Sequence, residues 1–381
     1  MSHGNELRGF ERILTTEVHV SNLLQELTDR DPTPWGEIIG MVPVTSDRER
    51  PFAKLKGRRS VRGTIDLLLT SSDGDEVAIE VKVAHQFSDG QRKRYEASSD
   101  GNLILVGMAA DSTLVNGYPR WSYRSLADVF NAWSGSCDEE AALLARMAAR
   151  AMRKWDTIVN SAFRPAVGAA KLGELKEKFV AILVSRQLKH DLNEHGWLSL
   201  AGVSSGSSGL ALVQGFAELN GDDARCLIAE ARWVEGLRQI NFRLGVDFSD
   251  LDETRESRSE AWALAKNMDA AIRVDAFASH LKQVRPELSE LIVFRGGGGR
   301  SNPNDEIWLP VVEHGLKNTT RRSVKPGFVG DGALRFEASG QIRANWIDAI
   351  DVRDLIDEAL KYLCSRLPAG YSAPGIARIG S

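Results

Sequence analysis

Three charged side chains interrupt two otherwise apolar segments, Arg62 to Thr70 and Glu76 to Ala84. They are Asp66 in the first segment and Glu80 and Lys82 in the second. Both segments alternate in hydropathy with a period of two, which predicts β-strands. Successive side chains of a strand point to opposite faces, so Glu80 and Lys82 share one face of theirs. Carboxylates beside an ammonium group are suited to holding a divalent cation and acting on a phosphate.

The turn between the two segments decides whether Asp66 joins Glu80, because a one-residue change of register moves a side chain to the opposite face. A two-residue loop would pair Asp66 with Val81 and separate the carboxylates. A three-residue loop, Ser72 to Gly74, with Gly74 in the left-handed conformation, pairs Asp66 directly with Glu80. Both turns are chemically allowed. We predict the second, since only it gives the carboxylates the roughly 5 Å Cβ separation of cross-strand partners.

Two predicted helices flank these strands and carry further polar side chains. The first helix, Glu11 to Leu27, has an apolar stripe at three- and four-residue spacing and includes Glu17. The second, Ser88 to Ser98, carries Gln91 and Tyr95 one turn apart. Gln91 and the serine three residues before it match a capping-box pattern, so Gln91 serves either that cap or the site. For Tyr95, packing is favoured over catalysis.

Several short motifs resemble those of the PD-(D/E)XK nuclease superfamily. They are Ile65-Asp66, the run Ile79 to Lys82, the pair Gln91 and Tyr95, and the upstream helical Glu17. The similarity covers Glu11 to Met108, and Ile65 replaces the proline of the superfamily's name. The resemblance implies an α/β fold of the restriction-endonuclease-like kind, a mixed sheet flanked by helices. It also implies hydrolysis of phosphodiester bonds at one end of the hairpin.

The resemblance implies a Mg²⁺ cofactor, for which Mn²⁺ can substitute. The implied metal ligands are Glu17 as an outer or second-metal ligand, Asp66, Glu80 and the backbone carbonyl of Val81. The implied catalytic residues are Asp66, Glu80, Lys82 and Gln91. Mg²⁺ prefers hard oxygen ligands and retains several waters, one of which can become the nucleophile. Lys82 would orient or activate that water and stabilise charge on the phosphate. The contrary interpretation is an ordinary surface ion pair on a half-solvated sheet.

Two clusters of basic residues indicate a nucleic-acid partner. Seven basic residues and one acidic residue lie between Arg48 and Arg62, directly before the first strand. A second cluster lies on the helix after the site. The candidate contacts are Arg58, Arg59, Arg62, Arg92, Lys93 and Arg94. Such residues suit phosphate contacts that position a nucleic acid without reading its sequence, although a solvated basic loop is the alternative.

Elements beyond the hairpin define the expected domain organisation. The order helix, strand, strand, helix, strand ends with the apolar run Asn102 to Met108, and we assign residues 1–137 to a nuclease-like domain. Residues 138–195 read as a helical connection. Residues 196–381 mix an alternating strand, Ile240 to Phe248, with a helix, Val352 to Leu363, which predicts an α+β C-terminal region for recognition, oligomerisation or regulation.

Composition fits a folded protein and excludes few functions. The chain has 381 residues, of which 43% are hydrophobic and 26% charged, with a net charge of −4. No run approaches the roughly 18 apolar residues of a membrane helix, so we expect a cytoplasmic protein without a membrane partner. We therefore expect a Mg²⁺-dependent nuclease that cuts DNA in bacterial restriction or antiviral defence, and two cuts on a duplex would favour a homodimer. The alternatives are an inactive binding module of the same fold and a non-enzymatic scaffold.

Overall fold

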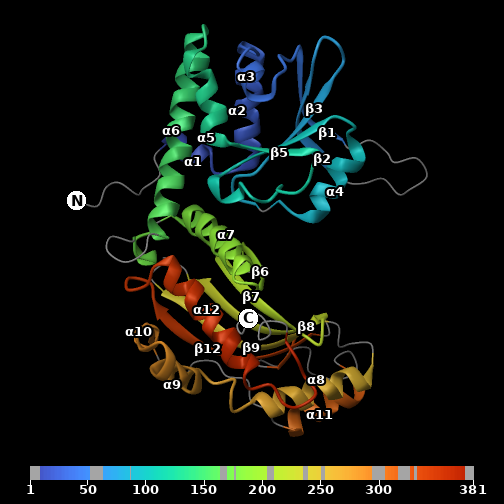
Figure 1. The fold of residues 1–381 in the computed structure, drawn as a ribbon, viewed down its shortest axis with the longest axis vertical. Coiled ribbons are helices and arrows are strands. Elements are labelled where there is room, and N and C mark those ends of the chain that lie inside the picture. The colour runs from blue at the N-terminus through green and yellow to red at the C-terminus, as the bar shows by residue number, and fades with distance from the viewer. Residues whose placement is uncertain are drawn as a thin grey trace. The chain divides into compact units, whose positions relative to one another are not determined.

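The chain divides into two compact units, Met1–Asn160 and Ser161–Ser381, in a computed structural model (Figure 1). The structure describes residues 9–51, 63–85, 87–163, 170–175, 177–203, 210–234, 239–249, 254–293, 305–315, 327–329 and 333–373. The sequence predicted boundaries after residues 137 and 195. The division after Asn160 lies between these two positions, near the end of the helix Glu139–Ala162.

The first unit is a mixed α/β structure built on a five-stranded sheet with flanking helices. Its strands are β1 (Thr45–Pro51), β2 (Thr64–Thr70), β3 (Glu76–Val81), β4 (Asn102–Gly107) and β5 (Trp121–Ser125), in that spatial order. The first three are antiparallel neighbours, and β3, β4 and β5 run parallel. Its helices are α1 (Gly9–Ile13), α2 (Glu17–Arg30), α3 (Trp35–Ile39), α4 (Asp89–Ser98), α5 (Leu126–Ala132) and α6 (Glu139–Ala162).

The turn between β2 and β3 has the predicted three-residue form. The backbone N–H of Ser71 donates to the carbonyl of Asp75 at 2.9 Å, and Gly74 adopts the left-handed conformation with φ +85°. Cross-strand pairs run from Thr70 opposite Glu76 to Leu67 opposite Ile79. These four pairs have the register that we predicted, in which position 66 would follow as the partner of position 80, and the ladder ends one residue before that pair.

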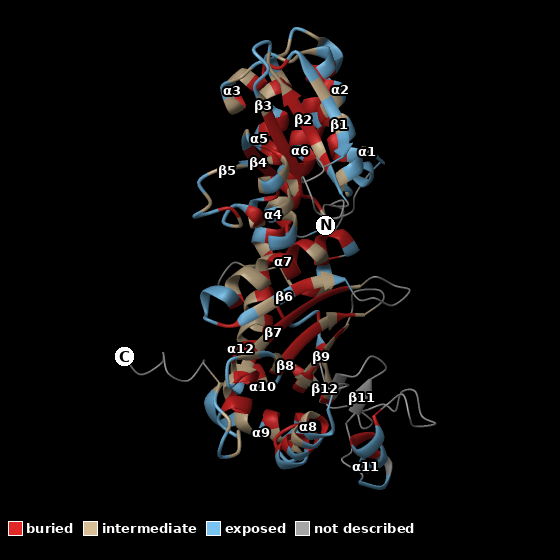
Figure 2. Cartoon of the chain, turned by 90° about the vertical axis from the view of Figure 1, so that its right-hand side faces the viewer, coloured by how far each residue is buried: buried red, intermediate tan, exposed pale blue. Residues whose placement is uncertain are grey.

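Apolar side chains bury both faces of the inner strands β2, β3 and β4 (Figure 2). Helix α2 packs on β1, β2 and β3 with Val20, Leu24 and Leu27 buried. The other face carries a cluster that includes Leu68, Ala78 and Tyr95 of α4. Helix α2 and helix α4 thus lie on opposite sides of the sheet (Figure 1). Charged side chains on these inner strands are therefore enclosed and need partners within the protein.

Two local features differ from the sequence-based expectation. The predicted helix Glu11 to Leu27 is two helices, because Thr16 adopts an extended conformation and its side chain caps α2 by accepting the N–H of His19. Strands β1 and β5 were not predicted. Strand β1 lies at the edge of the sheet with a polar, mostly exposed sequence, so it lacks the apolar alternation that identifies an inner strand.

The second unit is α+β, as expected, and is built on a seven-stranded sheet whose neighbours are all antiparallel. Its strands are β6 (Leu198–Val203), β7 (Ala211–Leu219), β8 (Asp222–Trp233), β9 (Gln239–Phe248), β10 (Ile292–Val293), β11 (Gly327–Val329) and β12 (Ala333–Arg343). Its helices are α7 (Lys178–Glu194), α8 (Arg255–Met268), α9 (Val274–Val284), α10 (Pro286–Ser289), α11 (Asp305–His314) and α12 (Ala349–Cys364). The predicted strand and the predicted last helix correspond to β9 and α12. Within the described ranges, no helix is both long and apolar enough to cross a membrane.

Gly74→Ala should lower the free energy of unfolding by about 1 kcal/mol, because an L side chain strains a left-handed backbone. No atom lies within 4 Å of a Cβ built at this position, so the loss would report backbone strain rather than a clash. Urea denaturation of the full chain measures it. Gly135→Ala is the matched control, since its Cβ also meets open space and its φ is ordinary. Equal losses in both variants would contradict the three-residue turn.

Candidate active site

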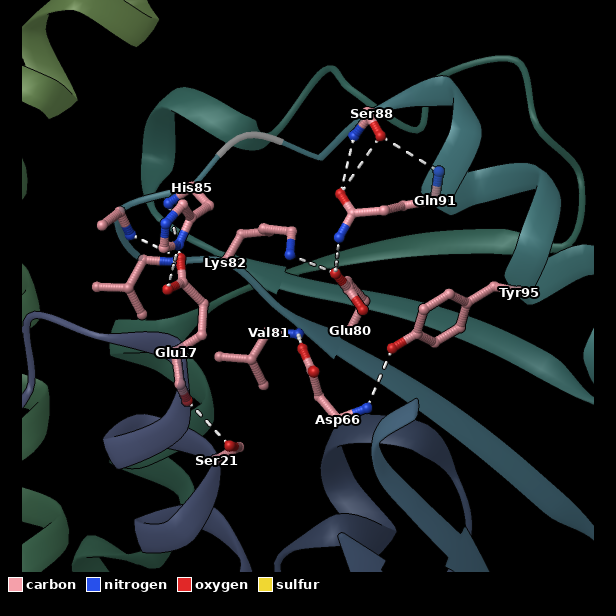
Figure 3. Close-up of polar contacts among 12 residues, drawn as sticks. Glu17, Ser21, Asp66, Glu80, Val81, Lys82, His85, Ser88, Gln91 and Tyr95 are labelled. Carbon is pink, nitrogen blue, oxygen red and sulfur yellow. Dashed lines mark hydrogen bonds and ion pairs between the residues drawn. The ribbon is translucent and has the colours of Figure 1, made fainter. Parts of the chain in front are cut away.

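Asp66 lies where β2 and β3 begin to separate. Its backbone N–H donates to the hydroxyl of Tyr95 at 3.1 Å, and its Oδ2 accepts the backbone N–H of Val81 at 2.9 Å. At this end of the hairpin the N–H of Val81 therefore donates to the Asp66 side chain and not to a backbone carbonyl of β2. The contact with Val81 fixes the direction of the Asp66 carboxylate toward the end of β3 (Figure 3).

Glu80 and Lys82 form a buried ion pair on the face of β3 that packs against α4. Their side chains are 2% and 5% exposed, and Lys82 Nζ contacts Glu80 Oε1 directly. Gln91 Nε2 donates to the same carboxylate oxygen at 3.1 Å. A buried charge is stable only with a partner and hydrogen bonds. The structure therefore brings together all four residues predicted to be catalytic, Asp66, Glu80, Lys82 and Gln91 (Figure 3).

Gln91 makes a contact of each kind that the sequence left open, one with the helix cap and one with a residue of the site. Its Oε1 accepts the backbone N–H of Ser88, and its own N–H donates to the Ser88 hydroxyl, each at 3.2 Å, which completes a capping box on α4. The amide end of the same side chain reaches Glu80. The start of α4 is therefore connected to a carboxylate of the site through one side chain.

The pKa of Asp66 is raised to about 7. Burial is the largest cause, followed by repulsion from Glu80, while the N–H of Val81 and the charge of Lys82 oppose the shift. Two carboxylates enclosed together disfavour a second negative charge. A divalent cation would relieve this repulsion, so the electrostatics of the pair fit a metal site.

Tyr95 has a polar function that its sequence pattern did not indicate. The residue is 1% exposed, packs against Trp121, and its hydroxyl accepts the N–H of Asp66. Burial raises the pKa of Tyr95 well above its usual value, helped by the charge of Glu80 and a hydrogen bond to it. The phenol is therefore neutral and lies between the two carboxylate residues. Tyr95 thus both packs in the core and holds Asp66 in position.

Glu17 is placed differently from the other predicted ligands. Its carboxylate accepts the backbone N–H groups of Val83, Ala84 and His85 and lies 2.8 Å from the His85 ring. Burial opposes ionisation, but the hydrogen bonds from His85 outweigh it and hold the pKa of Glu17 far below its usual range. The sequence did not point to His85, whose only indication is its position three residues after Lys82.

The donor set fits a divalent cation only in part. Among the described residues, no group of three or more His, Cys, Asp or Glu side chains is arranged to hold a metal. Asp66 and Glu80 nevertheless supply two carboxylates, and the peptide of Val81 lies against the first of them. Mg²⁺ in proteins uses one or two carboxylates and completes its shell with water and substrate oxygens. Asp66 and Glu80 thus supply the two carboxylates of such a site, and the observed contact of Val81 with Asp66 is made by its N–H.

The predicted nucleic-acid contacts are resolved for the second cluster alone. Arg58, Arg59 and Arg62 lie outside the described residues. Arg92 pairs with Glu96 at 2.9 Å and stacks on the ring of Tyr118 at 3.9 Å. Lys93 is exposed and Arg94 is half-buried. Within this cluster Lys93 is the side chain most open to solvent.

Comparison with known proteins found no relative of this chain. No protein-family model matches the chain, no curated protein matches it, and no solved structure matches it. The assignment of a function therefore rests on the residues and their geometry.

Asp66→Asn should stabilise the protein in chelator at pH 8, by on the order of 2 kcal/mol, and have little effect near pH 4. The folded-state pKa is raised to about 7 from 3.8, so the folded protein binds the extra proton and its stability falls as the pH rises through that window. Asparagine keeps an oxygen for the N–H of Val81. Urea denaturation across pH 4 to 8 measures the effect.

The control is Asp275→Asn, because Arg273 lowers the pKa of the Asp275 carboxyl. That shift has the opposite sign, so the substitution should bring no gain at high pH. A pH-independent effect of Asp66→Asn would refute the repulsion between the paired carboxylates.

Proposed function

We propose that the first unit is a Mg²⁺-dependent nuclease of the PD-(D/E)XK type, with Mn²⁺ able to replace Mg²⁺. The observation that carries the proposal is the enclosed arrangement of Asp66, Glu80 and Lys82, with Gln91 donating to Glu80. Chance charges on a half-solvated sheet would be exposed and separately hydrated. Here Glu80 and Lys82 are buried and Asp66 is half-buried, and each has a hydrogen bond or ion pair within the protein, which is typical of functional sites.

The arrangement of the strands supports a restriction-endonuclease-like fold. An antiparallel hairpin supplies the charged residues, and the parallel strand β4 follows after the crossover helix α4. Helix α2 precedes the hairpin and covers the face opposite α4. This order and layering are what the resemblance implies for the superfamily.

Asp66 and Glu80 would hold the metal, together with the carbonyl of Val81. A bound Mg²⁺ supplies a Lewis acid and lowers the pKa of a coordinated water. Glu80 is held in place by Gln91, and Asp66 by the N–H of Val81. These contacts orient the two carboxylates before any cation or substrate arrives, which is the preorganisation that catalytic sites need.

Lys82 has two roles in this proposal. In the structure its ammonium is the counter-charge of Glu80. When the charge of Glu80 is neutralised otherwise, Lys82 can donate to a phosphate oxygen or to the attacking water. A flexible four-carbon stem allows this change without movement of the strand. The same residue thus stabilises the free protein and acts on the substrate.

The proposed substrate is DNA, contacted through phosphates. Lys93 on α4 is exposed, and Gln91, two residues before it on the same helix, donates to Glu80. By resemblance, we place the activity in bacterial restriction or antiviral defence in the cytoplasm. The second unit would serve recognition, oligomerisation or regulation. A homodimer would make paired cuts. The rival functions are an inactive nucleic-acid or protein-binding module and a scaffold.

Mg²⁺ or Mn²⁺ at 100 times its dissociation constant should raise the melting temperature by about 5 °C, because the cation binds the folded state alone. Thermal denaturation in chelator and in a metal series measures the shift. Glu80→Gln should abolish it, since the amide is neutral and similar in size. An equal shift in Glu80→Gln, or none in the wild type, would favour the scaffold.

Lys82→Ala should reduce metal-dependent cleavage by about 100- to 1000-fold, because it removes a charge aimed at the reacting phosphate. Wild type and variant are incubated with supercoiled, linear and single-stranded DNA and with RNA, each with Mg²⁺, Mn²⁺ or chelator. Lys282→Ala, at an exposed lysine of the second unit, should cleave as the wild type does and excludes contamination. Metal-dependent binding without cleavage by the wild type would favour the inactive module.

A further inference from the structure

Both oxygens of the Glu17 carboxylate already have partners. Oε1 accepts the backbone N–H groups of Val83, Ala84 and His85 at 3.0, 2.8 and 2.7 Å, and Oε2 lies 2.8 Å from His85 Nδ1. Three consecutive N–H groups that converge on one anion form a nest, and hydrogen bonds to a charged acceptor are the strong ones. A cation could use this carboxylate as a ligand only by displacing these contacts.

The residues bound by Glu17 directly follow Lys82. The N–H of Lys82 itself donates to the carbonyl of Val106 on β4 at 2.9 Å. The Lys82 backbone is therefore held on both sides. Its own N–H is bound to strand β4, and the three residues that follow it are bound to Glu17. Figure 3 shows Glu17 and His85 on one side of Lys82, and Glu80 and Gln91 on the other.

Helix α2 gives Glu17 a rigid base. Glu17 is the first residue of this helix, Thr16 caps it, and the Ser21 hydroxyl donates to the Glu17 carbonyl at 2.9 Å. The buried side chains of α2 attach it to β1, β2 and β3. The turn after β3 is thus connected to a packed helix rather than left to solvent.

We propose that Glu17 is a positioning residue that sets the reach of the Lys82 ammonium through the turn 83–85, and that it is not a metal ligand. This inference rests on the proposed nuclease function, and it explains how the Lys82 ammonium is held in position. It departs from the ligand role that the sequence resemblance implies for the upstream glutamate. A neutral acceptor at position 17 should then suffice.

Two substitutions separate positioning from ligation. In Glu17→Gln the amide oxygen still accepts the three backbone N–H groups, whereas in Glu17→Ala no acceptor remains. The Gln variant should keep kcat within about threefold, and the Ala variant should lose about 10- to 100-fold in kcat with KM nearly unchanged. Mn²⁺ affinity, measured by calorimetry on the full chain, should not change in either variant.

Two readouts need no cleavage. In Glu17→Ala the amides of residues 83–85 should exchange hydrogen faster, and an amine-reactive reagent should label Lys82 faster, with Glu17→Gln close to the wild type in both. Equal Mn²⁺ losses in the two variants would identify Glu17 as a ligand and overturn the inference, as would unchanged labelling of Lys82 in Glu17→Ala. If the wild type cuts nothing, the nuclease fails, yet exchange and labelling still decide the role of Glu17.

Discussion

The enclosure of two carboxylates with a single ammonium group constrains the first unit more than any other interaction. Removing charged groups from water costs several kcal/mol per ion unless partners replace the lost hydration. Asp66 and Glu80 receive those partners from three groups: the N–H of Val81 on β3, the side chain of Lys82 directly after β3, and the side chain of Gln91 on α4. The sheet, its turn and α4 must therefore all be correctly placed before the site is stable.

The register of the hairpin is set by packing and the turn together. Leu67 pairs with Ile79 and Leu68 with Ala78, so both faces of the hairpin carry buried apolar side chains. A shift by one residue would exchange the faces of one strand and separate Asp66 from Glu80. Because apolar side chains bury either face, hydropathy alone does not choose the register. The turn makes that choice: Gly74 is left-handed, Asp73 is not, and the N–H of Ser71 donates to the carbonyl of Asp75, which is the three-residue form.

The sequence was sufficient where local rules apply. The alternation of β2 and β3 and the capping box at Ser88 each depend on neighbouring residues, and each matches the structure. Local rules allowed two turns, and the pairing of the carboxylates selected the one that the structure has. It was insufficient where distant residues meet. The attachment of Glu17 to the turn after β3 joins segments 66 residues apart, and a family pattern assigned that carboxylate to a metal. Exposed edge strands such as β1 carry too little apolar pattern to be recognised.

Gln91 shows how the site and the proposed substrate surface are linked. One side chain caps α4 and donates to Glu80, so the first turn of that helix and the carboxylate have a common anchor. Lys93 lies two residues further along the same helix. Side chains two residues apart point to different sides of a helix, so Gln91 faces Glu80 while Lys93 faces solvent, and α4 fixes the separation between them. Precision of this kind comes from connected secondary structure, because a loop could not keep two such contacts at a constant separation.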